Sequence, residues 1–311
     1  MSPEPTSVGE APFRCAAASL ERADPIAGSA ANVRTWLLLE HAGPWGSDAL
    51  LDARLPEGLG RALKQRARSA RAKALLIRRH RARADASAPV RVFAAYADPV
   101  SPRLESGVLA DPREALEVDL AALRAGGSSG LDPVEGPDRD LFCVCTNGRH
   151  DICCAERGRP IAEALAEAFP EQTWEVSHIG GDRFAGNMVV LPHGLYYGHL
   201  DPASALGVAE AQRRGELVLD HLRGRASYVM PVQAAESFLR AELGLLGLPD
   251  VEATRRVSDG NLSTVTLRAL GASYDVTVRS TRSETERGRM TCKASRDQPV
   301  PVHELIEIIR L

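Results

Sequence analysis

The sequence predicts an α/β protein in which a β-α-β-β-β-α unit occurs twice, followed by a small α+β region. Short apolar runs bounded by glycine and proline alternate with amphipathic helices, which is the pattern of an open α/β sheet. The same order of elements starts again after the segment GGSSG at residues 126–130. The phrases VLADP at residues 108–112 and GHLDP at residues 198–202 are also similar. We therefore expect three parts, at residues 1–125, 131–225 and 226–311.

The first unit follows a segment, up to about residue 34, that has few apolar anchors and in which we expect one short helix. Residues 36–40 form an apolar run that ends before a Gly-Pro pair, as in a buried strand. Pro56 suits the first turn of a helix to residue 70, and Asp111 before Pro112 predicts the start of a helix to about residue 124. The other strands expected in this unit are residues 74–78, 90–96 and 107–109.

The second unit begins with a short apolar strand at residues 142–145. A helix at residues 160–169 would place Ile161, Leu165 and Phe169 on one face. Asp201 before Pro202 predicts the start of another helix. The strands expected between these two helices are residues 173–176, 188–191 and 195–198.

The C-terminal region reads as a small α+β appendage. Residues 233–245 have the pattern of an amphipathic helix. Residues 262–270 and 273–279 alternate like two paired strands that are joined through Gly271. A last strand or helix is expected at residues 300–311.

The bulk composition is that of an ordinary soluble globular protein, with 44% hydrophobic residues and a net charge of −3. No apolar run reaches the 18 or so residues that a membrane span needs, so we expect no membrane segment. The first 15 residues lack the basic and apolar regions of a secretory signal, which favours the cytoplasm. Six cysteines are too few for a disulfide scaffold in 311 residues, and their clustering indicates metal or redox chemistry.

Residues 141–200 hold four of the six cysteines and four of the eight histidines. Cys145 ends a predicted strand and Cys154 lies near the start of the following helix, so the loop between them could wrap an inorganic group and point its amides at thiolate and sulfide. His178 follows the strand at 173–176, at the edge where open α/β sheets place their sites. Gly180 and Gly181 would let the backbone pass close to a bulky group, and Asp182 could supply a fourth ligand.

The phrases CTNGRHDICCAERGRP and SHIGGDRFAGNMVVLPHGLYYG resemble the sucrase/ferredoxin-like proteins, a branch of the thioredoxin-like 2Fe-2S ferredoxins. CAAASLER at residues 15–22 and RTWLLLEH at residues 34–41 are similar to the N-terminal half of that family, and the resemblance covers most of residues 13–225. It implies tandem thioredoxin-like units and a 2Fe-2S cluster held by mixed cysteine and histidine ligands. Matched by position, Cys145 and Cys154 are the cysteine pair and His178 is the first histidine.

This sequence departs from the family pattern at the fourth ligand, where the resemblance implies a second histidine and Asp182 stands instead. Oxygen is a harder donor than iron–sulfur centres normally use. Either Asp182 is the fourth ligand, or Cys153, His193 or His199 replaces it, or the cluster is labile or absent.

The other cysteines and histidines have simpler interpretations. Cys143, Cys15 and Cys292 are expected to pack as small apolar residues. Cys153 is expected either to be spare or to support the ligands without binding the metal, because it adjoins Cys154. His150, His193 and His199 are expected to be surface or hydrogen-bonded histidines.

Residues 61–83 carry ten Lys or Arg and no acid. We interpret them as a solvated basic helix face and an edge strand; the alternatives are docking of an acidic redox partner or of nucleic acid. Nucleic acid is disfavoured because no zinc-finger spacing or DNA-reading motif accompanies the run. The chain also lacks a dinucleotide fingerprint, a phosphate loop and a nucleophile elbow, and no carboxylate pair indicates glycoside hydrolysis.

We expect a non-catalytic electron carrier that exchanges electrons through a 2Fe-2S cluster with a redox partner protein. The first alternative is a thiol redox protein that uses Cys145, Cys153 or Cys154, against which the absence of a CxxC motif weighs. The second is a binding module stabilised by zinc on Cys145, Cys154, His178 and Asp182.

Overall fold

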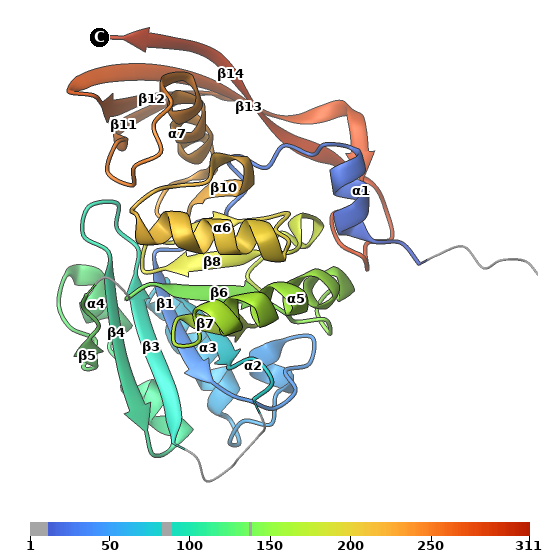
Figure 1. Ribbon diagram of the computed structural model, residues 1–311, viewed down its shortest axis with the longest axis vertical. Coiled ribbons are helices and arrows are strands. Elements are labelled where there is room, and N and C mark those ends of the chain that lie inside the picture. The colour runs from blue at the N-terminus through green and yellow to red at the C-terminus, as the bar shows by residue number, and fades with distance from the viewer. Residues whose placement is uncertain (1–11, 83–88, 137–138) are drawn as a thin grey trace, which may run out of the picture.

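The computed structural model describes residues 12–82, 89–136 and 139–311, and Figure 1 shows its mixed α/β architecture. A large mixed sheet has ten strands in the order β10-β9-β8-β6-β7-β2-β1-β3-β4-β5, and a second sheet has four, in the order β11-β12-β13-β14. The two open sheets expected from the sequence form one sheet. They join where β2 (Lys73–Arg78) and β7 (Thr173–Val176) pair antiparallel.

Both parts of the large sheet have the same strand order. In the first part, β1 is parallel to β2 and antiparallel to β3, which pairs antiparallel with β4. In the second part, β6 is parallel to β7 and antiparallel to β8, which pairs antiparallel with β9. These strands are β1 (Thr35–Glu40), β3 (Val90–Tyr96), β4 (Arg103–Leu109), β6 (Leu141–Cys145), β8 (Met188–Leu191) and β9 (Leu195–Tyr197). The order and type of these eight strands agree with the expectation, and only their ends differ.

The two outermost strands of the large sheet, β5 (Asp132–Pro133) and β10 (Leu222–Arg225), were not expected. Strand β10 has the sequence LRGR, and all four residues are buried. Its two arginines make the sequence look unlike a buried strand, because charged residues are almost never fully buried unless they are paired. The structure supplies the partners, since Arg225 pairs with Glu236 and Arg223 donates to Asn187 Oδ1.

Side-chain caps decide where several helices begin. Helix α5 (Ile152–Ala168) starts well before the expected residue 160 because Asp151 accepts a hydrogen bond from the amide of Cys153. Pro160 consequently lies inside the helix and not in its first turn. The expected start of α6 (Pro202–Arg213) is confirmed, with Asp201 and Ser204 forming a capping box.

The helix expected at residues 112–124 is two helices. A 3₁₀ helix, η1 (Pro112–Leu116), is followed by α4 (Leu120–Ala125). The side chain of Asp119 accepts from the amides of Ala121 and Ala122, so a new helix starts there. Two further helices, α2 (Ala49–Asp52) and α3 (Leu59–Ser69), cover the first part of the sheet (Figure 1).

The glycine-rich segment at residues 126–130 is held to the sheet and does not behave as a free linker. Ser129 is buried, and its amide and hydroxyl donate to Glu105 Oε2 at 2.8 and 2.5 Å. The chain then pairs with β4 through β5.

Strand β6 separates two cores because its side chains alternate between faces. Phe142 and Val144 pack with Ile161 and Leu165, as expected for the apolar face of α5. Cys143 and Cys145 point into the opposite core with Trp36 and Trp174 among others. Cys145 therefore points into the core opposite to Ile161 and Leu165, and Cys154, from the first turn of α5, reaches this same core at the end of the strand.

The C-terminal region is α+β, as expected. Helix α7 (Met230–Leu243) packs on the second sheet, which consists of β11 (Glu252–Asp259), β12 (Leu262–Ala269), β13 (Ala272–Gly288) and β14 (Gln298–Arg310) (Figure 1). Strand β11 was not expected, and β13 is longer than expected. Helix α1 (Cys15–Glu21) lies beside the connection between β13 and β14, although these segments are at opposite ends of the chain (Figure 1).

The basic run divides between α3, β2 and the turn after it, and several of its side chains are paired. The edge strand expected here is wrong, because β2 is an inner strand that pairs with β1 on one side and β7 on the other. Arg78 pairs with Glu175 at 2.7 Å, Lys64 pairs with Asp48, and Arg81 pairs with Glu163. Arg83 lies outside the described residues, as do residues 1–11, which make up most of the segment expected to lack a secretory signal. The helices in the described part of the chain are too short or too polar to span a bilayer.

Candidate metal centre

Cys145 and Cys154 meet because α5 packs directly against the end of β6. Cys145 is the last residue of β6, and Cys154 lies in the first turn of α5. Gly158 allows this contact: a Cβ at this position would lie 2.1 Å from the carbonyl oxygen of Cys145. Both cysteines are buried, at 1% exposure each.

His178 and Asp182 come from the loop after β7. Ser177 fixes the start of this loop on β2, because its amide donates to the Leu76 carbonyl and its hydroxyl accepts from the Leu76 amide. Asp182 begins the short 3₁₀ helix η2 (Asp182–Phe184) and is buried. The loop thus turns His178 and Asp182 back toward the two cysteines.

The four residues expected at the site lie together. The Sγ atoms of Cys145 and Cys154 and one ring nitrogen of His178 all lie within 4.8 Å of one another. Cys154 Sγ lies 3.6 Å from Asp182 Oδ1, and His178 Nδ1 lies 3.2 Å from the same oxygen. The site therefore offers two sulfur atoms, one imidazole nitrogen and one carboxylate.

His150 adds a second imidazole that was not expected at the site. Its ring stacks on that of His178, with centroids 3.6 Å apart and planes at 15°. Its Nδ1 donates to the Ser47 carbonyl at 3.2 Å, which leaves Nε2 3.9 Å from Asp182 Oδ2. Its position within the CTNGRHDICC loop, four residues before Cys154, was the sequence feature that could have indicated this.

A buried arginine holds the loop that carries His178. The Arg223 guanidinium donates to the Gly180 carbonyl at 2.9 Å and to Asn187 Oδ1 at 2.8 Å. Gly181 has φ +83, and a Cβ there would lie 2.3 Å from Arg223 Nη2. Gly181 therefore makes room for Arg223, whereas the sequence had suggested that it makes room for an inorganic group.

The two thiols of the site have opposite pKa shifts. A hydrogen bond from Cys154 lowers the pKa of Cys145 well below its ordinary value, and His178 and the Asn147 amide act in the same direction against burial. The same hydrogen bond, together with burial and the charges of Cys145 and Asp182, raises the pKa of Cys154. Burial also raises the pKa of Asp182, although His178 opposes this shift. The site thus favours an anionic sulfur at Cys145.

The site is closed on its sulfur side and accessible on its imidazole side. The side chains of His178 and His150 are 23% and 35% exposed. They line a groove of about 1360 Å³ whose other walls are α2, α3 and the start of β2. The first part of the large sheet therefore contributes to the surface over the site.

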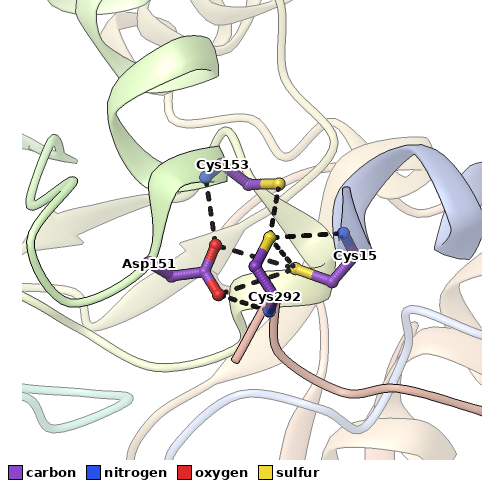
Figure 2. A group of neighbouring side chains, drawn as sticks. All are labelled: Cys15, Asp151, Cys153 and Cys292. Carbon is purple, nitrogen blue, oxygen red and sulfur yellow. Dashed lines mark hydrogen bonds between the residues drawn. The ribbon is translucent and has the colours of Figure 1, made fainter. Parts of the chain in front are cut away.

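A second group of metal-ligating side chains lies around the start of α5 and is shown in Figure 2. It consists of Cys15, Asp151, Cys153 and Cys292, whose donor atoms all lie within 4.8 Å of one another. Cys15, Cys153 and Cys292 pack with Ala16 and Ala185, as expected for small apolar residues, but the structure also brings their sulfurs together, which the sequence did not indicate. The fold brings α1 and the β13–β14 connection against α5, and no local pattern in the sequence indicates this contact.

The thiols of this second group also differ in pKa. The pKa of Cys153 is lowered to about 6, chiefly by a hydrogen bond from Cys15 and, against burial, by the amide of Ala16. The same contact with Cys153 and burial raise the pKa of Cys15, and burial raises that of Cys292 to about 12. Cys153 is thus the thiol of this group that ionises most easily.

The model of the sucrase/ferredoxin-like proteins matches residues 26–224, which is more than half of the chain. The chain belongs to the sucrase/ferredoxin-like family. A curated relative, the Altered inheritance of mitochondria protein 32 of Meyerozyma guilliermondii, is 24% identical over 96 residues, which cover 27% of this chain and 34% of the relative. The chain thus spans about a third of the length of that relative. No solved structure matches the chain significantly.

In this sucrase/ferredoxin-like protein, the three residues named as substitutes for Asp182 lie elsewhere. Cys153 belongs to the second group. His193 Nε2 lies 3.4 Å from Asp140 Oδ1, and His199 Nε2 lies 3.5 Å from Ser19 Oγ. Cys143 is buried beside Cys145 in the apolar core, as expected, and burial raises its pKa to about 12.

Proposed function

We propose that this protein is an electron carrier that holds a 2Fe-2S cluster on Cys145, Cys154, His178 and Asp182. The observation that supports this most strongly is the convergence of two thiols and one imidazole from separate loops within 4.8 Å. Such a mixed sulfur and nitrogen donor set suits iron–sulfur ligation. Family membership agrees with it, since the sucrase/ferredoxin-like model covers all four residues.

The residues present fit such a group. Among the described residues, Nδ1 of His178 is buried and has no hydrogen-bond partner, although Asp182 Oδ1 lies only 3.2 Å away. A buried nitrogen without a partner is costly unless something binds it. A metal at this position would satisfy the nitrogen and neutralise the charges of Asp182 and the Cys145 thiolate.

The burial of the site favours electron exchange with a partner through the side that carries His178 and His150. Burial of Cys145 and Cys154 keeps water from the sulfur ligands, while His178 and His150 reach the groove. When bound, the cluster would supply one-electron transfer, with a potential raised by imidazole ligation relative to four thiolates. A redox partner protein would approach over the two histidines, since they are the exposed edge of the site.

We further propose that each part of the large sheet is a thioredoxin-like unit. The shared strand order, with the third strand antiparallel to the first and the second parallel to it, supports this. The compartment that we propose is a reducing one such as the cytoplasm, because all six cysteines are free.

A zinc-stabilised binding module is the second candidate. The short spacing of the donors favours it, because one tetrahedral ion can bind four ligands gathered this closely. A thiol redox protein would use the hydrogen-bonded pair Cys145 and Cys154, which lack the CxxC spacing.

Elemental analysis after anaerobic purification separates these three functions. The proposal predicts two irons and two acid-labile sulfides per chain, lost in Cys154→Ser and retained in Cys143→Ala. Cys143 is the matched control because it lies on β6 beside Cys145 but outside both groups of donors. Zinc without sulfide, lost in Cys154→Ser, would establish the binding module. A metal-free protein with a reversible Cys145–Cys154 disulfide would establish the thiol redox protein.

A further inference from the structure

The second group of donors connects three distant parts of the chain. Cys15 is the first residue of α1, Asp151 and Cys153 form the cap and first turn of α5, and Cys292 lies in the connection between β13 and β14 (Figure 2). Cys15 and Cys292 are 277 residues apart in the sequence. Such a gathering of three thiols is not explained by the packing of any one element.

The three sulfur atoms are in direct contact. Cys153 Sγ lies 3.3 Å from Cys292 Sγ, which lies 3.5 Å from Cys15 Sγ. Asp151 closes the group, with its oxygens 3.8 and 3.9 Å from Cys15 Sγ. In a tetrahedral zinc site, Zn–S bonds of about 2.3 Å place neighbouring sulfurs roughly 3.8 Å apart. A small outward movement of the sulfurs would therefore enclose one such ion.

Backbone amides hold the group in this geometry. The Cys292 amide donates to Asp151 Oδ2 at 2.7 Å, and the Cys153 amide donates to Asp151 Oδ1 at 3.0 Å. The Cys15 amide donates to Cys292 Sγ at 3.4 Å. Hydrogen bonds of this kind orient the ligands of a metal and stabilise their negative charge.

Three of the four residues of the group are closed to solvent. Cys15, Asp151 and Cys153 are at most 2% exposed, and Cys292 is partly exposed. Ala16, Ala185 and Phe13 pack around the sulfurs, and Arg289 covers the ring of Phe13. Four protein ligands without an open position are the arrangement of structural zinc sites, whereas catalytic sites keep one position open.

We infer that Cys15, Cys153, Cys292 and Asp151 bind one Zn²⁺ ion that fastens α1 and the β13–β14 connection to the start of α5. The protons still carried by the three sulfurs pass to solvent as the ion binds, and no bond between heavy atoms of the chain is made or broken. A disulfide would join only two of the three sulfurs and leave the third buried beside it. This site is independent of the proposed cluster and involves none of its ligands.

Zinc analysis of matched variants tests this inference. Wild-type protein purified anaerobically with zinc should hold one zinc per chain. Cys15→Ser and Cys292→Ser should lower zinc affinity by more than about 100-fold, since even the loss of outer-shell partners costs 10–100-fold. Cys154→Ser and Cys143→Ala should retain the zinc. Loss of iron in Cys154→Ser with zinc retained would separate this site from the cluster.

Cobalt gives a readout on the wild-type protein that does not depend on the folding of any variant. In the wild-type protein, Co²⁺ bound in place of zinc should show intense thiolate-to-cobalt absorption and the visible bands of a tetrahedral ion. Three results would overturn the inference: wild-type protein that binds neither ion after reconstitution, zinc that is retained in Cys292→Ser but lost in Cys154→Ser, or a Cys153–Cys292 disulfide found by peptide mapping.

Discussion

Cys153 and Cys154 are neighbours in the chain, yet their side chains belong to different groups of metal-ligating residues. Cys153 Sγ lies 3.3 Å from Cys292 Sγ, whereas Cys154 Sγ lies 3.6 Å from Asp182 Oδ1. Successive residues of a helix point about 100° apart, so the first turn of α5 can serve two sites at once. The cap residue Asp151 fixes this turn and thereby sets the direction of both side chains.

Replacement of Asp182 tests its role as the fourth ligand. Asp182→Ala should lower the iron content of purified protein by at least half, because a ligand is removed and the site is left with three. Asp182→His should retain iron, because imidazole is an established donor to such clusters. Since neutral imidazole then replaces a carboxylate, the reduction potential should rise by on the order of 100 mV.

His150→Ala is the matched control for this experiment, because His150 stacks on His178 and lies near Asp182. It should keep the iron that Asp182→Ala loses. The opposite result, with iron lost in His150→Ala and kept in Asp182→Ala, would make His150 the ligand and Asp182 its neighbour.

Gly181→Ala should destabilise the protein through the loop that carries His178. The added methyl would lie 2.3 Å from Arg223 Nη2 on a backbone at φ +83. Strain of 1–3 kcal/mol and disturbance of a buried arginine together predict a loss of about 3 kcal/mol in the free energy of unfolding. Urea unfolding of the metal-free protein measures this loss.

Gly180→Ala separates strain from steric contact, because Gly180 also has positive φ, at +100, but a Cβ there would meet nothing within 4 Å. Gly180→Ala should lower the free energy of unfolding by less than Gly181→Ala does. Equal losses in the two variants would mean that the contact with Arg223 contributes nothing.

Stability should fall in mild acid because of His199. Burial, with the charge of Arg157, lowers the pKa of His199 to about 4 from an ordinary value of 6.5. Between these values the unfolded chain binds a proton that the folded chain does not, so the free energy of unfolding falls as the pH falls from 6.5 to 4. After allowance for partial exposure, the loss should be about 2 kcal/mol.

His199→Asn should flatten this pH dependence, and urea unfolding at several pH values between 7 and 4 measures it. Asparagine is a suitable replacement because His199 has φ +53, a conformation that asparagine tolerates. An unchanged slope in the variant would assign the acid sensitivity to other groups.

The sequence predicts the eight inner strands of the large sheet and the meeting of Cys145, Cys154 and His178, because alternation and capping are local properties. Strand β10 was not predicted because its two arginines are buried by partners outside the strand: Arg223 donates to the Ser29 carbonyl, 194 residues away, and Arg225 pairs with Glu236 of α7. The helix α5 starts earlier than expected. Proline is typical of a first helical turn, which favoured a start at Pro160, whereas the cap at Asp151 starts the helix at Ile152. Cys15 and Cys292 could not be assigned to a site, since only the tertiary fold brings them to Cys153.

Electron paramagnetic resonance of the reduced protein tests the central proposal most directly. Anaerobically purified wild-type protein, reduced with dithionite, should show the signal of one unpaired electron on a 2Fe-2S cluster, with about one spin per chain. Cys154→Ser should lack this signal while Cys143→Ala retains it. A wild-type protein that contains its full complement of metal and shows no such signal before or after reduction would contradict the account.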